Sequence, residues 1–463
     1  MGLPGRAVSK RTEKPTRRLN SDRDRSPHAH AHGDEDASLM ASVSYDDDAR
    51  GKAEAPSGAA APAAAAPAAA APSQPTSKPL SKFRSGSAPR TEKFLKLLDE
   101  PIVNLEALRE LGWSGIPARL RPLCWKLLLG YVPPNRDLRE GVLGRKRSEY
   151  KNLVDEYYNP ILEETRLANA NANSNASSNQ MVSELRQVAV DVPRTAPDVP
   201  FFHQEQIQRS LERILFIWGM RHPASGYVQG INDVATPFLA VFFYGELVDG
   251  RKRVTGTGTG TGTESTNASD GDDAEANVDA ADVVRRLNEL DKLDDVELND
   301  AMLLRVEADA YWCLCKVLDG IQDHYTYAQP GIQKTLFRVG ELVGRVGKHV
   351  ADHLAKEHCE YMQFAFRWCN CLLLRELSFD LGIRLWDTYV SEGSKLKDFL
   401  VYVLSSFLLS WAPELVKMDL EGLIMFLQRA PTQAWTERDV ETVLSRAYMW
   451  RLSFANAASH LAS

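Results

Sequence analysis

Three side chains in the middle of the 463-residue chain are of types that assist phosphate chemistry: Asp191, Arg194 and Gln229. Pro193 restricts the backbone immediately before the arginine. An arginine offered outward suits phosphate oxygens, because its planar guanidinium presents a fork of donors and stays charged at every relevant pH. The glutamine lies in HPASGYVQGIND, residues 222–233, between two strongly apolar stretches, where it could meet a group outside the chain.

The residues around Arg194 allow more than one interpretation. Val188, Val190 and Val192 alternate as in a β-strand, but a short extended connector between helices produces the same pattern. Asp191 and Arg194 could form a local salt bridge at a loop, which their spacing alone favours. In the alternative, Asp191 anchors the loop that presents Arg194 to a phosphate.

The stretch 222–233 is either a plain turn or a contact site. Gly226 and Gly230 would allow close backbone approach to another protein. Tyr227 is expected to pack the turn, with a place in the contact surface as the alternative. Asn232 and Asp233 are expected to cap the next helix. The glutamine between the two glycines is then expected to face the site and not the core.

The elements that must position these residues are helices. In residues 204–220, the apolar side chains recur with a helical period on one face, and His222-Pro223 ends the pattern. The same periodicity returns in the segments 301–320, 360–377, 398–411 and 421–431. Candidate strands are scarce. The sequence therefore predicts an all-α protein of many helices.

Caps and breakers predict several helix boundaries. We expect the folded part to begin near Thr91. A short helix should follow, with Asn104 as its N-cap and Gly112 as its stop. Pro117 suits the first turn of the next helix, and Gly130 suits its end.

Low-complexity segments set the domain organisation. Residues 1–90 combine a basic start, a HAHAH tract and AAAPAAAAPAAAAP, in which repeated prolines forbid a continuous helix, so we expect a disordered tail. A folded domain over 91–460 should carry two disordered inserts, at about 169–180 and 250–300. Such inserts cost little, because loop-closure entropy grows only logarithmically with length.

Composition excludes several classes of function. A formal net charge of −7 and a pI near 5.9 argue against a general nucleic-acid binder. The apolar runs fall short of the roughly 20 residues that a transmembrane helix needs. We find no nucleotide-binding loop and no nucleophile–base set. The six cysteines lie in apolar contexts and are expected to be buried cytosolic thiols: Cys124, Cys313, Cys315, Cys359, Cys369 and Cys371.

A cluster of His349, His353, His358 and Cys359 resembles a metal set, because the first two residues stand four apart on a predicted helix. The stretch is polar, so a solvated helix face is the plainer explanation. We therefore predict no metal site there.

Four motifs, taken in order, resemble the TBC domain of Rab GTPase-activating proteins. The I-x-x-D-x-x-R motif is present as Val188–Arg194, with valine in place of the usual isoleucine, and Y-x-Q-G as Tyr227–Gly230. R-x-x-x-W-K is present as Arg121–Lys126, and FRWCNCLLLREL…RLWDTY spans 366–389. The resemblance covers roughly 91–460 outside the inserts. The sequence of residues 214–238 is similar to that of the Golgi-associated branch of the family.

This resemblance implies a multi-helix, two-lobed domain that binds a Rab-family small GTPase in its GTP form and accelerates GTP hydrolysis. Arg194 would be an arginine finger that lies against the phosphates, and Gln229 a glutamine finger that orients the attacking water. Asp191, Tyr227, Gly226 and Gly230 would support them. The protein would have no cofactor of its own, since GTP and Mg²⁺ belong to the partner GTPase.

Such a protein is an enzyme activator and not a self-contained enzyme. It would regulate vesicle trafficking from the cytoplasm, peripherally at the Golgi or other endomembranes. The rival interpretation is a catalytically inactive TBC scaffold that binds Rabs or trafficking partners. Inactive relatives are expected to lack one or both fingers, and this chain has both. Arg121 and Trp125 are expected to be structural, and so are Arg367-Trp368 and the pair Arg384 and Trp386.

The segment RSGSAP, residues 84–89, resembles a phosphoserine site of the kind read by 14-3-3 proteins. Arg84 lies three residues before Ser87, and Pro89 lies two after it. Such partners hold the phosphate in an arginine cluster. The alternative is an unmodified linker serine.

Overall fold

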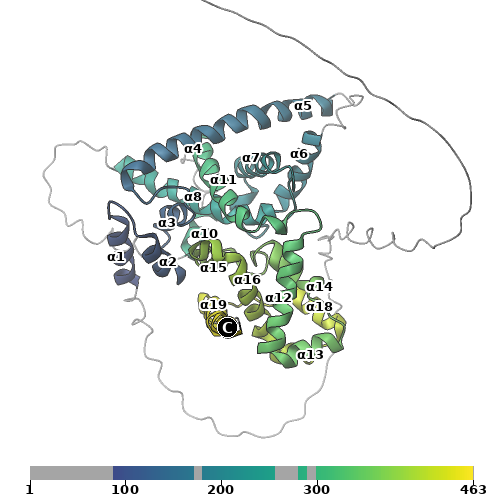
Figure 1. Cartoon of the computed structure of the whole chain (residues 1–463). Coiled ribbons are helices and arrows are strands. Elements are labelled where there is room, and N and C mark those ends of the chain that lie inside the picture. Colours follow the sequence, from purple (N-terminus) through teal and green to yellow (C-terminus); the bar gives the residue numbers. More distant parts are fainter. Residues whose placement is uncertain (1–86, 171–179, 256–279, 289–298, 462–463) are drawn as a thin grey trace, which may run out of the picture. The chain divides into compact units, whose positions relative to one another are not determined.

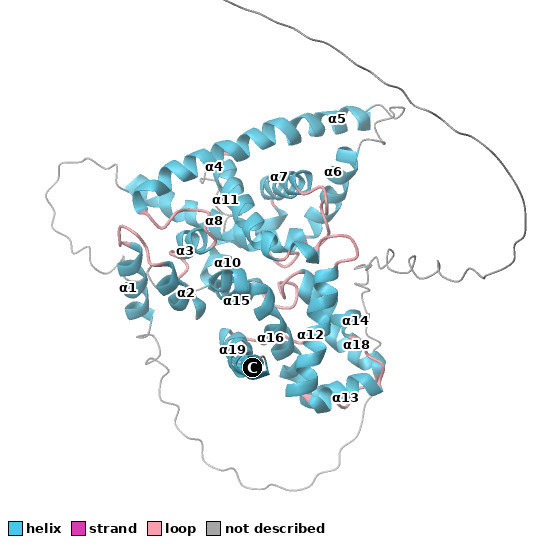
Figure 2. Ribbon diagram, viewed as in Figure 1, coloured by secondary structure: helices cyan, strands magenta, loops and turns pink. Residues whose placement is uncertain are grey.

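The structure is a computed structural model, and it describes residues 87–170, 180–255, 280–288 and 299–461 (Figure 1). Over these ranges the chain forms helices joined by short loops (Figure 2). Within the described part, the β-pairing is limited to one isolated antiparallel bridge between Ile102 and Asn135. The all-α prediction is therefore confirmed.

The helices form an N-terminal and a C-terminal group. The first comprises α1 (Ser87–Leu98), α2 (Leu105–Trp113), α3 (Arg121–Leu128), α4 (Arg139–Leu153), α5 (Asn159–Ala170), α6 (Gln180–Asp191), α7 (Glu205–Arg221), α8 (Ile231–Thr255), α10 (Ala280–Asn288) and α11 (Asp300–Gly320). The second comprises α12 (Pro330–Val346), α13 (Lys348–Lys356), α14 (Tyr361–Asn370), α15 (Phe379–Glu392), α16 (Leu396–Leu408), α17 (Ala412–Leu415), α18 (Leu420–Gln428) and α19 (Glu437–Leu461). Helix α15 joins the groups, because it packs against α2 and α10 as well as α16 and α19.

A buried carboxylate on α15 holds the two groups together. Asp387 accepts hydrogen bonds from Nε and Nη2 of Arg121, both at 2.9 Å. It also accepts from Trp125 Nε1 at 2.8 Å and from the Ile116 backbone N–H at 2.9 Å. Phe238 packs edge-on against the indole of Trp125. The R-x-x-x-W motif and RLWDTY are thus two halves of one structural centre.

Replacing Asp387 by alanine should lower the free energy of unfolding by about 3–5 kcal/mol, because the change leaves the Arg121 guanidinium buried and unpaired. Denaturant titration of the purified protein measures the loss. The matched control is Asp99→Ala, which breaks an exposed ion pair with Arg136 and should cost about 1 kcal/mol or less. Similar losses in both variants would contradict the structural role of Asp387.

The cap and breaker residues predicted some helix boundaries correctly and others incorrectly. Asn104 caps α2, accepting backbone hydrogen bonds, and Gly130 ends the turn after α3 with a φ of +68°. Gly112 does not stop α2, which continues to Trp113. A Cβ on Gly112 would lie 2.9 Å from Ser391 Oγ, so this glycine permits α2 to approach α15. Pro117 lies in the turn before α3 and not in the helix.

The folded part begins four residues earlier than predicted, because α1 starts at Ser87 and not at Thr91. Arg90 explains the difference. Its Nη2 donates to the backbone oxygens of Leu111 and Gly115, at 2.7 and 2.6 Å. These contacts hold the first turn of α1 against the end of α2.

The expected disordered insert at 250–300 is partly wrong. Helix α10 lies inside it and packs against α8 and α15, with Val283 and Leu287 buried. Helix α8 also continues to Thr255. The remaining parts of the expected tail and inserts, residues 1–86, 171–179, 256–279 and 289–298, lie outside the described residues.

Two helical stretches, Ile231–Val248 and Phe379–Leu415, are long and apolar enough to cross a membrane, but 78% and 67% of their residues are buried in the packed interior. Core helices have the same properties, so packing accounts for their apolar character. The six cysteines are free and buried, as predicted. Burial raises the pKa of each thiol.

Candidate functional site

Arg194 lies on a short turn that directly follows α6. The alternation of valines does not mark a strand or an extended connector, because α6 runs to Asp191 and a 3₁₀ turn covers Val192–Arg194. Val188 and Val192 are both buried, as residues four apart on a helix face are, while Val190 is exposed. Arg194 ends the turn with its side chain exposed.

Gln229 lies on the loop between α7 and α8, and its side chain is also exposed. The glycines near it have a role in the chain's own packing. Gly226 and Gly230 have φ values of +61° and +105°, which favour glycine. A Cβ on Gly230 would lie 2.2 Å from Asn370 Nδ2, so no other residue fits there.

A network of hydrogen bonds joins these two loops. The Tyr227 hydroxyl donates to Asp191 Oδ2 at 2.9 Å, and Thr195 Oγ1 donates to the Asp191 carbonyl at 3.0 Å. Asn232 Nδ2 donates to Thr195 Oγ1 at 2.9 Å, while its Oδ1 accepts from the Gly230 N–H at 2.8 Å. Tyr227, Thr195 and Asn232 are buried. Arg194 and Gln229 are therefore each one residue away from the same buried network.

Asp191 accepts its hydrogen bond from Tyr227 and not from Arg194. Burial raises the pKa of this carboxyl group, and the Tyr227 hydrogen bond and the charges of Arg194 and Arg375 oppose the rise. Asp191 thus ties the loop of Arg194 to the loop of Gln229, and Arg194 itself is exposed. Tyr227 is almost fully buried, in accord with packing of the turn.

A third segment, residues 370–376, completes the site, and sequence reasoning gave it no role there. Asn370 Nδ2 donates to the Gln229 carbonyl at 2.9 Å. Cys371 Sγ donates to Asp233 Oδ2 at 3.4 Å, so Asp233 is a buried carboxylate of the site. The expectation that Asn232 and Asp233 cap α8 is wrong, because both residues lie within its first turn. Burial raises the pKa of Asp233, and the positive charge of Arg375 is the largest opposing influence. FRWCNCLLLREL was visible as a family motif, but its contacts depend on the fold.

The remaining candidate residues have partners of their own. No group of three or more metal-ligating side chains occurs among the described residues, and His353 Nε2 donates to the Met418 carbonyl at 2.8 Å. Arg367 forms an ion pair with Glu376 at 2.7 Å, and Arg384 donates to Thr388 at 3.1 Å.

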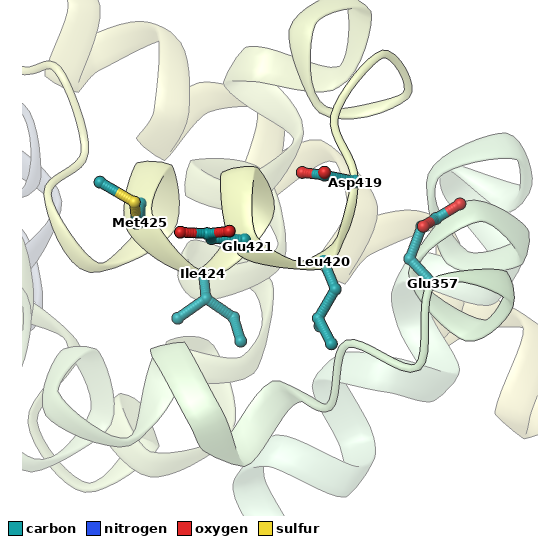
Figure 3. Close-up of a pocket in the computed structure, with 6 residues that line it drawn as sticks. All are labelled: Glu357, Asp419, Leu420, Glu421, Ile424 and Met425. Carbon is teal, nitrogen blue, oxygen red and sulfur yellow. The ribbon is translucent and has the colours of Figure 1, made fainter.

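A shallow groove of about 530 Å³ lies between the end of α13 and the start of α18 (Figure 3). Its lining residues are Glu357, Asp419, Leu420, Glu421, Ile424 and Met425. Two of its carboxylates already have partners, because Glu357 pairs with Lys356 and Asp419 caps α18. No lining residue has a cationic or amide side chain, so the groove offers no side-chain donor that could bind a phosphate group.

The described part is thus an all-helical domain that presents an exposed arginine and an exposed glutamine on two loops bound to one buried network. The chain matches the Rab-GTPase-TBC domain family over residues 118–416. It is 42% identical over 373 residues to GTPase-activating protein gyp1 of Schizosaccharomyces pombe, and 40% identical over 372 residues to human TBC1 domain family member 22B. The chain therefore belongs to the Rab-GTPase-TBC domain family.

Each of these alignments covers 80% of this chain and 63% of the relative, so the chain spans less than two thirds of their length. Among solved structures, it is similar to the crystal structure of the Ypt/Rab-GAP domain of Gyp1p, with 36% identity and a TM-score of 0.64. That likeness covers 79% of this chain and 98% of the solved domain.

Proposed function

We propose that this protein is a GTPase-activating protein for Rab-family small GTPases, which it recognises in their GTP form. The observation that carries the proposal is the joint presentation of Arg194 and Gln229, both exposed and both attached to one buried network. Two of the relatives, from Schizosaccharomyces pombe and Saccharomyces cerevisiae, are named as GTPase-activating proteins. The segments that present the fingers lie within the matched family region.

The two fingers would divide the chemistry between them. Charge develops on the phosphate oxygens as the γ-phosphoryl group is transferred, and the Arg194 guanidinium would stabilise it with paired hydrogen bonds. Gln229 would hold the attacking water in line, in place of the GTPase's own glutamine. Because the network fixes both loops beforehand, little reorganisation is needed when the partner docks. The nucleotide and Mg²⁺ would be supplied by the GTPase.

The rival function is a TBC scaffold that binds Rabs without accelerating hydrolysis. A GTPase assay with a panel of GTP-loaded Rabs separates the two functions. Activation predicts faster phosphate release from at least one Rab, with the effect lost in the Arg194→Ala variant. Binding to a GTP-loaded Rab without faster hydrolysis would instead identify the scaffold.

As a regulator of vesicle trafficking, the protein would act peripherally at Golgi or other endomembranes, as its resemblance to the Golgi-associated branch of the family implies.

We further propose that phosphorylated Ser87 binds a 14-3-3 protein. Arg84 and Pro89 flank the serine, and α1 begins at Ser87, at the border of the described domain. A fluorescent phosphopeptide spanning residues 80–92 should bind 14-3-3 in a polarisation titration, and the unphosphorylated peptide should not. A peptide phosphorylated at Ser85 instead is the matched control. Equal binding of the two phosphopeptides, or no binding, would exclude Ser87 as the recognised residue.

A further inference from the structure

Asn370, the last residue of α14, contacts the peptide that carries Gln229 across a sequence separation of 141 residues. Asn370 is only 6% exposed, and its Nδ2 donates to the Gln229 carbonyl at 2.9 Å. The backbone of Asn370 is held in turn, because the Tyr325 hydroxyl donates to its carbonyl at 2.8 Å. The Gln229 peptide is thus bound to a rigid helix end.

The rest of the Asn370 side chain does little for the stability of the fold. Its Oδ1 is buried without a hydrogen-bond partner among the described residues. Leaving a buried polar atom unpaired costs free energy. An apolar residue would avoid this cost, so stability alone does not explain an asparagine here. The hydrogen bond that the amide donates to the Gln229 carbonyl does explain it.

The backbone that follows Asn370 is also unusual. Leu372 and Leu373 adopt positive φ values of 50° and 64°, in the left-handed region that residues other than glycine rarely occupy. Both leucines are buried, and the Leu373 N–H donates to the Trp368 carbonyl at 2.9 Å, so packing imposes the turn. Residues in such conformations cluster at functional sites. This turn ends α14 with Asn370 directly against Gly230.

We propose that Asn370 is a positioning residue for Gln229. Its amide fixes the orientation of the Gln229 peptide, and thereby the direction in which the exposed side chain leaves the backbone toward the partner's nucleotide. Gly230 supplies the space for the Asn370 side chain, because a Cβ at this position would lie 2.2 Å from Asn370 Nδ2. This inference rests on the proposed function of Gln229. It adds a residue from the C-terminal group of helices to a site whose fingers come from the N-terminal group.

The test is Asn370→Ala, assayed for activation of a responsive GTP-loaded Rab under single-turnover conditions. A displaced catalytic group can cost up to about 10²-fold in rate. We expect the maximal rate to fall by about 10- to 100-fold, with little change in the activator concentration that gives the half-maximal rate. Asn370→Asp has the same shape but faces the carbonyl with an acceptor, so it should lose at least as much. Cys369→Ala, a buried neighbour without contact to Gln229, is the control.

A double-mutant cycle separates positioning from a general effect on the fold. If Asn370 acts through Gln229, Asn370→Ala should change the rate less than about twofold when Gln229 is already alanine. A loss of the same size in both backgrounds would overturn the inference, as would a wild-type rate for Asn370→Ala. Near-wild-type activation by Gln229→Ala alone would instead refute the glutamine finger itself. Thermal melting accompanies each variant, and Asn370→Ser, also too short to reach Gln229, replaces an unstable alanine variant.

Discussion

Arg194→Lys is expected to abolish most of the activation of a responsive Rab, although it keeps the positive charge. An arginine finger accelerates GTP hydrolysis by about 10³- to 10⁵-fold, which corresponds to about 4–7 kcal/mol of barrier. Lysine carries a compact charge on a flexible stem and cannot form the paired hydrogen bonds of a guanidinium. Single-turnover phosphate release, compared between the two proteins, measures the loss.

The matched control is Arg209→Lys on α7, an exposed arginine that pairs with Glu205. It should activate like the wild type and melt at the same temperature. Because Arg194 is exposed and its loop is held through Asp191 and Thr195, Arg194→Lys should also melt normally. An active Arg194→Lys variant would contradict the arginine finger. A lowered melting temperature would assign the lost activity to the fold.

Gln229→Ala should reduce activation by a factor comparable to that of Arg194→Lys. Without the side-chain amide, the attacking water is no longer held in line with the transferring phosphate. The fold should persist, because the contacts of this residue to the network run through its backbone carbonyl and through Gly230. Phosphate release at saturating activator measures the change, and Gln206→Ala, an exposed glutamine on α7, is the control.

A second substrate sharpens this test. A Rab whose own glutamine is replaced by alanine should still be activated by the wild-type protein, because Gln229 would do the work of that side chain. The same Rab should not respond to Gln229→Ala. If the altered Rab fails with the wild-type protein while the ordinary Rab responds to Gln229→Ala, the GTPase supplies the glutamine. Arg194 would then be the one finger contributed by this chain.

The sequence alone was sufficient for features that depend on neighbouring residues. Helical periodicity in 204–220 reports which side faces the core, and the Asn104 cap depends on backbone groups two and three residues away. Arg194 and Gln229 were visible because their types and their motifs indicate phosphate chemistry. Local sequence patterns did not predict the secondary structure correctly where one pattern fits both a strand and a helix. The valines at 188, 190 and 192 have the spacing of a strand, but Val188 and Val192 are also spaced to lie on one side of a helical backbone. Burial of these two side chains in the core favours the helical structure.

Tertiary structure alone decided which distant residues meet. Asp387 binds Arg121 across 266 positions, and Asn370 binds the Gln229 peptide across 141. Neither contact leaves a period or a cap in the sequence, because each arises from how helices pack. Helix α10 was not predicted for the same reason. Its buried residues Val283 and Leu287 lie in a polar insert, and they become part of the core only because α10 packs against α8 and α15. The sequence thus determined the chemistry proposed for Arg194 and Gln229, and helix packing determined what holds their loops in place.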